Sequence, residues 1–166
     1  KMRKLRPAFQ KEGSVTAGNA STINDGAAAV VLMSEDKAEK LGLTPIAKII
    51  SQASSAHEPE WFTTAPVKAM KKAVKKANLS MNDIDLFEVN EAFSVVTMAA
   101  EKDLNLDSEK VNVLGGAVSM GHPIGASGAR IICTLLNAMQ QKNVNNGMAS
   151  ICIGGGEASA IIVEKI

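Results

Sequence analysis

The sequence predicts an α/β domain with a mostly parallel, five-stranded sheet and helices on both of its faces. Short apolar runs typical of buried strands alternate with segments of helical periodicity, and such alternation is typical of a parallel sheet. The 166 residues are 46% hydrophobic and 21% charged, which suits one globular domain with a sizeable core. A glycine run near the carboxyl end, Gly154 to Gly156, predicts that the last two strands form an antiparallel hairpin.

The elements of this domain follow one another as strand, helix, strand, helix, strand, helix, strand, strand. The strands are expected at 46–53, 84–89, 111–114, 148–153 and 158–164, and the helices at 64–77, 91–104 and from the end of a glycine-rich loop to about 142. In the helix at 64–77 the apolar residues share one face. Its lysines lie mainly on the other face and are interpreted as a solvated surface rather than a binding patch.

The first 42 residues do not fit this unit. Residues 1–18 are polar and irregular, whereas 27–33 is a continuous apolar run, as expected of a strand buried on both faces. Ser34 then caps a short helix, expected at 35–41, that Gly42 ends. The chain does not begin with Met, and we expect it to be part of a longer protein.

The composition argues against several classes of function. Eighteen Lys and Arg against 17 Asp and Glu leave a net charge of +1, and aromatic residues make up 3%, so a surface that binds nucleic acid is not supported. No apolar run is long enough to span a membrane, and no signal-peptide core follows the basic N-terminus. Two histidines far apart and two cysteines, expected as free thiols, have no spacing suited to a metal.

The stretch from Leu114 to Arg130 holds five of the thirteen glycines and His122. Glycines let the backbone turn sharply and approach a ligand closely, and Pro123 stiffens the residue next to the imidazole. From this stretch alone, a ligand-binding loop and a tight turn with an exposed histidine are equally well supported.

Three polar sites fall at the carboxyl ends of predicted strands: Asn90, the His122 loop and Cys152. Ligands bind at that edge of open α/β sheets. An imidazole, a thiol and an amide suit proton transfer, and the glycine N–H groups after Cys152 could face a thiolate or an oxyanion. Each residue also has a structural explanation, because Cys152 could fill the core, Asn90 could cap a helix and the glycines could only form a hairpin turn.

Five motifs in register resemble the thiolase family, and within it the acetyl-CoA acetyltransferases. They are TAGNAS at 16–21, NDGAAA at 24–29, NEAF at 90–93, GHPIGASGAR at 121–130 and CIGGG at 152–156. The resemblance covers essentially the whole chain. It implies a thiolase-like fold in which 1–18 ends a loop domain, 19–42 ends an amino-terminal half, and 43–166 is the carboxy-terminal domain.

The resemblance also implies roles for individual residues. His122 matches the histidine that activates a nucleophilic cysteine, Cys152 the acid/base at the α-carbon, and Asn90 the residue that holds a water in one oxyanion hole. The N–H of Gly154 would contribute to the second hole. Ala17 and Ser21 match positions that contact the pantetheine arm of CoA. Phe9 and Phe93 match positions that line the acyl pocket.

The nucleophilic cysteine of the family has no counterpart here, because Cys133 matches no catalytic position. We therefore expect the chain to carry only the acid/base half of the site, to be inactive alone, and to self-associate or be marginally stable. The partners implied are acetyl-CoA, acetoacetyl-CoA and the missing amino-terminal half. A homotetramer, a place in fatty acid metabolism, no cofactor other than CoA as substrate, and a cytoplasmic or mitochondrial location are also implied.

Two alternatives stay open. A degradative 3-ketoacyl-CoA thiolase would act on longer chains, although bulky aromatics such as Trp61 and Phe62 favour the short-chain branch. A non-catalytic, thiolase-like module that binds CoA or lipid would not need Asn90, His122 and Cys152 together. The family includes a branch that binds a monovalent cation near residues 17–20, which the sequence does not test.

Overall fold

A computed structural model describes all 166 residues of the chain. A four-stranded mixed sheet carries the domain, with strand order β1-β4-β3-β2. The strands are β1 (Ala47–Ala56), β2 (Leu86–Val89), β3 (Asn146–Ile153) and β4 (Glu157–Lys165). The main helices are α1 (Glu35–Lys40), α2 (Ala65–Ala77), α3 (Ser94–Leu104), α4 (Ala117–Met120) and α5 (Ser127–Lys142). The α/β class is confirmed.

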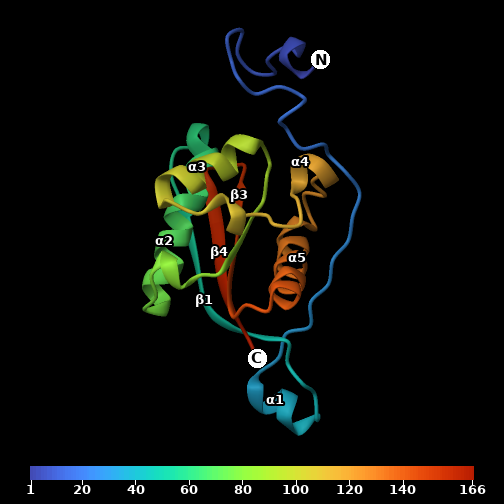
Figure 1. Cartoon of the computed structure of the whole chain (residues 1–166), viewed down its shortest axis with the longest axis vertical. Helices are drawn as coiled ribbons and strands as arrows, with labels where there is room; N and C mark the ends of the chain where they lie inside the picture. The colour runs from blue at the N-terminus through green and yellow to red at the C-terminus, as the bar shows by residue number, and fades with distance from the viewer.

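Helices cover both faces of the sheet (Figure 1). On one face α2 and α3 pack over a core that includes Met70, Val96, Met148 and Ile162. On the other face α5 packs against β2 and β3, and buries Ile131 and Leu135 among others. The N-terminal segment first lies beyond one end of this unit and then runs down along the α5 side, and α1 projects at the end opposite the N-terminus (Figure 1). No helix of the structure has the length and apolarity needed to cross a membrane.

The predictions of five strands and of a mostly parallel sheet are wrong. Only β2 and β3 pair in parallel, whereas β4 is antiparallel to both β3 and β1. The reason is that the second arm of the final hairpin enters the sheet between β3 and β1, so the alternation of strands and helices along the chain does not give their neighbours in space. The hairpin itself, with its turn at Gly154 to Gly156, is confirmed.

The fifth strand, expected at 111–114, is replaced by a turn. Val111 makes a single parallel bridge to Phe87, and Asn112 then adopts a left-handed backbone conformation with φ 48°. The Asn112 side chain accepts from the N–H of Val89 (2.8 Å) and donates to its carbonyl (2.9 Å). One side chain therefore takes the place of the next strand residue at the edge of β2.

The apolar run at 27–33 is extended, has no partner strand and is largely exposed. Val31 and Leu32 keep 84% and 71% of their surface accessible. The expectation of a strand buried on both faces is wrong for this chain, because nothing in it pairs with the run. The short helix that follows is confirmed, with the Ser34 hydroxyl accepting from the N–H of Lys37.

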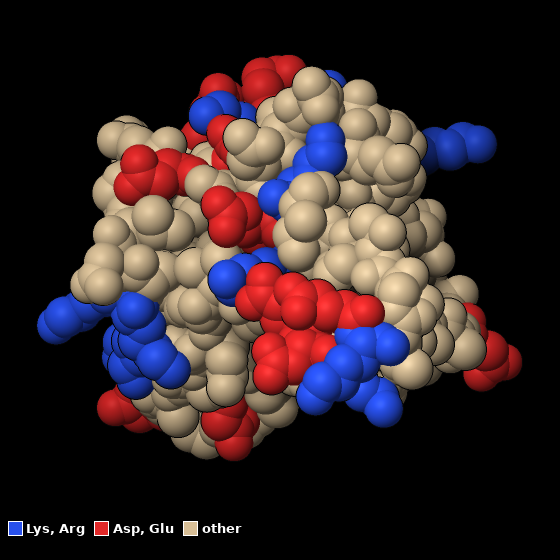
Figure 2. Space-filling model, turned by 90° about the horizontal axis from the view of Figure 1, so that it is seen from below, with Lys and Arg blue, Asp and Glu red and all other residues tan.

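The lysines of α2 are exposed, as expected. Two of them also reach the backbone of β1, which is an edge strand of the sheet. Lys76 donates to the carbonyl of Gln52 (2.7 Å) and Lys72 to that of Ser54 (3.2 Å). Charged side chains at an edge strand discourage pairing with another chain. On the face seen from below, acidic and basic side chains lie next to one another (Figure 2).

Candidate active site

The carboxyl ends of β2 and β3 lie side by side and bring two of the predicted residues to one edge. Val89 is in register with Ser150, and the N–H of Asn90 donates to the Ser150 carbonyl (2.9 Å). Cys152 follows two residues later on β3. The sheet edge predicted from the sequence is therefore where Asn90 and Cys152 are found.

His122 reaches the same edge from the loop before α5. Its ring Nε2 lies 3.5 Å from Nδ2 of Asn90, a side chain with no exposed surface. Its ring Nδ1 lies 2.6 Å from Oγ of Ser127, in the first turn of α5. Its backbone N–H donates to the carbonyl of Thr22 (2.8 Å), so the N-terminal segment also fixes the loop.

These contacts select one form of the imidazole. The Ser127 hydroxyl donates to the Pro123 carbonyl (3.1 Å), so its oxygen accepts from Nδ1–H of His122. The neutral ring then carries a lone pair on Nε2, which faces the amide N–H of Asn90. Burial, with the nearby Arg130 charge as a second cause, lowers the pKa of His122. A neutral ring with a free Nε2 is the form that accepts a proton.

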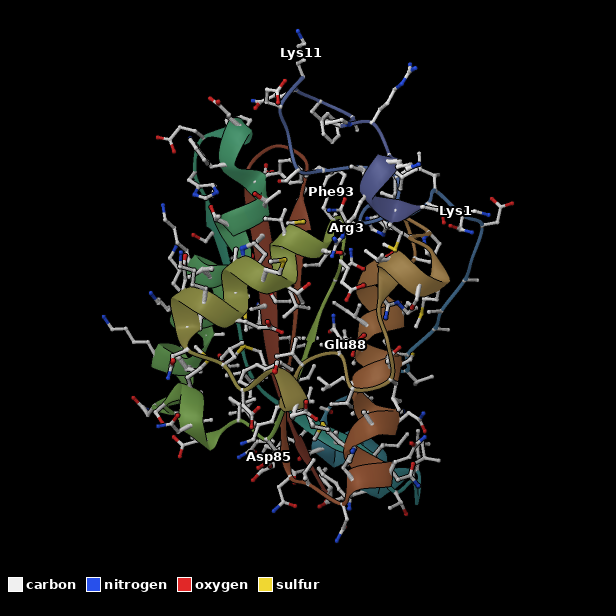
Figure 3. All side chains as sticks on the ribbon, turned by 45° about the horizontal axis from the view of Figure 1, so that its top comes forward. Lys1, Arg3, Lys11, Asp85, Glu88 and Phe93 are labelled. Atoms are coloured by element: carbon white, nitrogen blue, oxygen red, sulfur yellow. The ribbon has the colours of Figure 1, made fainter.

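A buried ion pair stands behind Asn90. Arg130 of α5 donates from Nη1 to Glu88 (2.9 Å) and from Nη2 to the Asn90 side-chain oxygen (3.1 Å). Glu88 is 2% exposed and lies between β2 and α5 (Figure 3). Burial raises the pKa of Glu88 to about 7, against the opposing influence of Arg130. The pair connects the sheet, α5 and the amide of Asn90.

The side chain of Glu91 holds the glycine-rich loop by hydrogen bonds. Its carboxylate accepts from Asn112 Nδ2 (3.1 Å) and from the N–H of Val118 in α4 (2.9 Å). A Cβ at Gly116 would collide with that carboxylate, and Gly121, with φ 98°, faces the Asn24 side chain too closely for one. At these two positions the absence of a side chain lets the loop pack against its neighbours.

Cys152 is a buried thiol, 9% exposed, and packs with the core on the α2 and α3 side of the sheet. No hydrogen bond joins it to His122 or Asn90. Burial raises the pKa of Cys152 to about 11. Desolvation outweighs a backbone hydrogen bond that lowers the pKa, so the thiol is the favoured form of Cys152 in this chain. Both cysteines are free thiols, as expected.

Gly154 is exposed in the hairpin turn, and its N–H donates to no carbonyl of the chain. It is thus available to a ligand. The turn is held by its neighbour Gly156, which has φ 93° and lies against the backbone of His57 and Pro59. The N–H of His57 donates to the Gly156 carbonyl (3.1 Å), so the segment with Trp61 and Phe62 is fixed beside the turn.

The N-terminal segment crosses the same end of the domain. Ser21 donates from its hydroxyl (2.9 Å) and its N–H (3.1 Å) to the Ala92 carbonyl. The ring centroid of Phe93 is 5.5 Å from that of Phe9 and 6.1 Å from that of Phe62, both edge-to-face. Ala17 lies exposed in the turn before this crossing. The two predicted acyl-pocket residues therefore touch, together with Phe62, whereas Trp61 is 57% exposed.

Sequence reasoning did not assign roles to Arg130, Glu88, Ser127 or Asn112. One signal was available, because Glu88 is an acidic residue within a strand otherwise made of Leu, Phe and Val. A buried charge requires a partner, and Arg130 is the charged residue of the motif at 121–130. The pairing itself depends on how α5 packs on β2, which residue spacing does not give. No group of three or more His, Cys, Asp or Glu side chains is placed to hold a metal.

Comparison with known families decides the relationship. The model of the thiolase C-terminal domain matches residues 43–165, and that of the thiolase N-terminal domain matches residues 1–36. The chain belongs to the thiolase family.

Individual thiolases match over nearly the whole chain. An acetyl-CoA acetyltransferase of Escherichia coli is 56% identical over 162 residues, and one of Schizosaccharomyces pombe is 52% identical over 166. Among solved structures, the acetyl-CoA acetyltransferase of Bacillus anthracis has a TM-score of 0.96 at 46% identity. The human mitochondrial 3-ketoacyl-CoA thiolase in complex with CoA has a TM-score of 0.92 at 43% identity.

These matches cover 98% to 100% of this chain but 41% or 42% of each relative. The chain therefore spans about two fifths of the length of the thiolases it matches.

Proposed function

We propose that the protein that includes this chain is an acetyl-CoA C-acetyltransferase, and that this chain supplies the acid/base half of its site. The observation that carries the proposal is the contact between Asn90 and the proton-accepting Nε2 of His122, at the edge where β3 places Cys152. The curated relatives named acetyl-CoA acetyltransferases, 52% and 56% identical, support this substrate.

In this proposal His122 takes the proton of a cysteine thiol that lies outside this chain, and the resulting thiolate attacks the thioester carbonyl of acetyl-CoA. CoA leaves as its thiol, and an acetyl-cysteine remains. In this proposal an amide N–H of Asn90 holds a water or donates to the developing oxyanion. A single donor of this kind contributes roughly 10²–10³-fold to such reactions.

The second step is proton transfer at the α-carbon of the next acetyl-CoA. Cys152, whose thiol has given its proton to the departing CoA thiolate, removes the α-proton as a thiolate and becomes the thiol again. The carbanion attacks the acetyl-cysteine, giving acetoacetyl-CoA and releasing the cysteine thiolate, which takes back the proton held by His122. In the reverse direction the Cys152 thiol returns the proton. Since the pKa of Cys152 is raised to about 11, the resting residue is the proton donor, and its thiolate, once formed, is a strong base.

Activity on longer 3-oxoacyl-CoA substrates is the second candidate, favoured by the 0.92 TM-score of the human 3-ketoacyl-CoA thiolase. The rings of Phe93 and Phe62, 6.1 Å apart, support the short-chain proposal, because aromatic side chains at the predicted acyl pocket leave less room for a long tail, whereas Phe9 is 71% exposed.

A chimera tests the proposal. This chain replaces the matching 41% of the Escherichia coli relative, whose own amino-terminal part supplies the nucleophile. We expect synthesis and thiolysis of acetoacetyl-CoA, and a much lower rate on a long-chain 3-oxoacyl-CoA. A folded chimera without activity on acetoacetyl-CoA would contradict the proposal. The 166-residue chain alone, incubated with acetyl-CoA, should show no stable acyl adduct by mass spectrometry.

A further inference from the structure

Arg130 bridges a buried carboxylate and the side chain of Asn90. The two terminal nitrogens of its guanidinium have separate partners, with Nη1 bound to Glu88 (2.9 Å) and Nη2 to Oδ1 of Asn90 (3.1 Å). Nη1 also lies 3.4 Å from the hydroxyl of Thr134, one turn along α5. The planar fork of a guanidinium can serve two acceptors at once, which the single ammonium of lysine cannot reproduce.

This bridge settles which end of the Asn90 amide faces the imidazole. Because Oδ1 accepts from Arg130, Nδ2 points to Nε2 of His122 at 3.5 Å. With the amide reversed, Oδ1 would face Nε2 and accept from a protonated ring nitrogen. That arrangement would favour the imidazolium or the Nε2–H tautomer, neither of which has a lone pair on Nε2.

We propose that Arg130, held by Glu88, is a positioning residue that orients the Asn90 amide so that Nε2 of His122 stays unprotonated and able to accept a proton. The inference deepens the proposed function and rests on it for its catalytic meaning. Arg130 acts through Asn90, and it touches no reacting atom.

Among the other surroundings of His122, Ser127 favours the same tautomer, because it accepts from Nδ1–H on the opposite side of the ring, and Arg130 adds the orientation of the amide that faces Nε2. The N-terminal segment contributes the Thr22 carbonyl, followed by the exposed Asp25. Glu91 is engaged with Asn112 and Val118, and Cys152 is a neutral buried thiol. The charged groups behind Asn90 are therefore Arg130 and Glu88.

The test uses the two histidines of the chain, His57 and His122. Nitrogen NMR of the 166-residue chain labelled at histidine reports the tautomer and the pKa of each ring, with His57 as an internal reference. The variants are Arg130→Lys, which keeps the charge but not the fork, and Glu88→Gln with Arg130→Met, which removes both charges. Thr134→Val is the matched control, because it removes the third contact and leaves the Glu88 and Asn90 contacts intact.

We expect the Nδ1–H tautomer to predominate at His122 in the unmodified chain and in Thr134→Val. Arg130→Lys should raise the pKa of His122, with the Nε2–H tautomer appearing. The double variant should raise the pKa further, since the repelling charge is lost as well. A folded Arg130→Lys chain whose His122 keeps the original tautomer and pKa would overturn the inference. If Arg130→Lys does not fold, the double variant decides, and an unchanged tautomer and pKa of His122 in that variant would likewise overturn the inference.

The same substitution in the chimera separates the two proposals. Arg130→Lys should lower kcat by about tenfold or more and change KM for acetyl-CoA by less than about twofold, because binding groups are untouched. An active chimera indifferent to Arg130→Lys would contradict the inference alone. A chimera that is inactive even with Arg130 would contradict the proposed function, while the NMR result would still decide whether Arg130 orients Asn90.

Discussion

The buried carboxyl of Glu88 should make the stability of this chain fall as the pH rises. Its pKa is raised from 4.5 to about 7 because burial disfavours the charged form more than Arg130 favours it. A carboxyl with a higher pKa in the folded chain holds more protons there than in the unfolded chain. Its contribution to stability is therefore complete below pH 4.5 and is lost as the pH rises through about 7.

The size of the effect follows from the shift. A difference of roughly 2.5 units corresponds to about 3 kcal/mol in the free energy of unfolding between those pH values. The lowered pKa of His122 has the opposite sign, because the unfolded chain then binds more protons and stability rises with pH. A variant is needed to separate the two groups.

Glu88→Gln removes the titration and keeps an oxygen that can accept from Arg130. Urea unfolding at several pH values between 4 and 8 gives the free energy of unfolding of both chains. As the pH rises over this range, the value for the unmodified chain should fall by about 3 kcal/mol relative to that of the variant. Glu164→Gln makes the same change at an exposed residue of β4 and should not alter the pH dependence. Parallel curves for the unmodified chain and Glu88→Gln would refute the reasoning.

Three further substitutions test how the site is held. Ser127→Ala removes the acceptor of His122 Nδ1–H, and should lower kcat of the chimera about five- to tenfold; unchanged kcat would contradict this role. Asn112→Ala leaves the buried Val89 N–H without its acceptor and strains a left-handed backbone, so urea unfolding should show a loss of about 2–4 kcal/mol. A loss below 1 kcal/mol would count against the edge pairing described above. Gly156→Ala should cost about 2 kcal/mol or more, because its Cβ meets the His57 carbonyl at φ 93°. Gly154→Ala is its control, since a Cβ there meets nothing within 4 Å, and equal losses at the two glycines would be inconsistent with this account.

The sequence predicted the parts of the fold that local pattern determines. Helix α2, with its lysine face outward, and the hairpin of β3 and β4 follow from periodicity and from a glycine turn. The position of Asn90 and Cys152 at one edge followed from their place at strand ends. The roles assigned to them came from the family resemblance and stay predictions.

The errors occurred where packing decides the outcome. Residues 111–114 have the apolar character of a strand, but the Asn112 side chain satisfies the edge of β2 and a turn follows. The prediction of a mostly parallel sheet was wrong because β4 lies between β3 and β1, and no local sequence pattern determines that strand order. The raised pKa of Cys152 comes from its burial in the core, which also depends on packing. Likewise, Arg130 gained its importance only from the way α5 packs on Glu88.

Exchange of the α-protons of acetyl-CoA is the most direct test of the claim that this chain carries the acid/base half of a thiolase site. The chimera is incubated with acetyl-CoA in deuterated water, and both deuterium uptake and acylation are followed by mass spectrometry. With Cys152→Ala we predict that acylation persists and that exchange falls by about 10²-fold or more. Cys133→Ala, at the exposed cysteine of α5, should leave both unchanged. Deuterium uptake at the full rate in Cys152→Ala would contradict the claim.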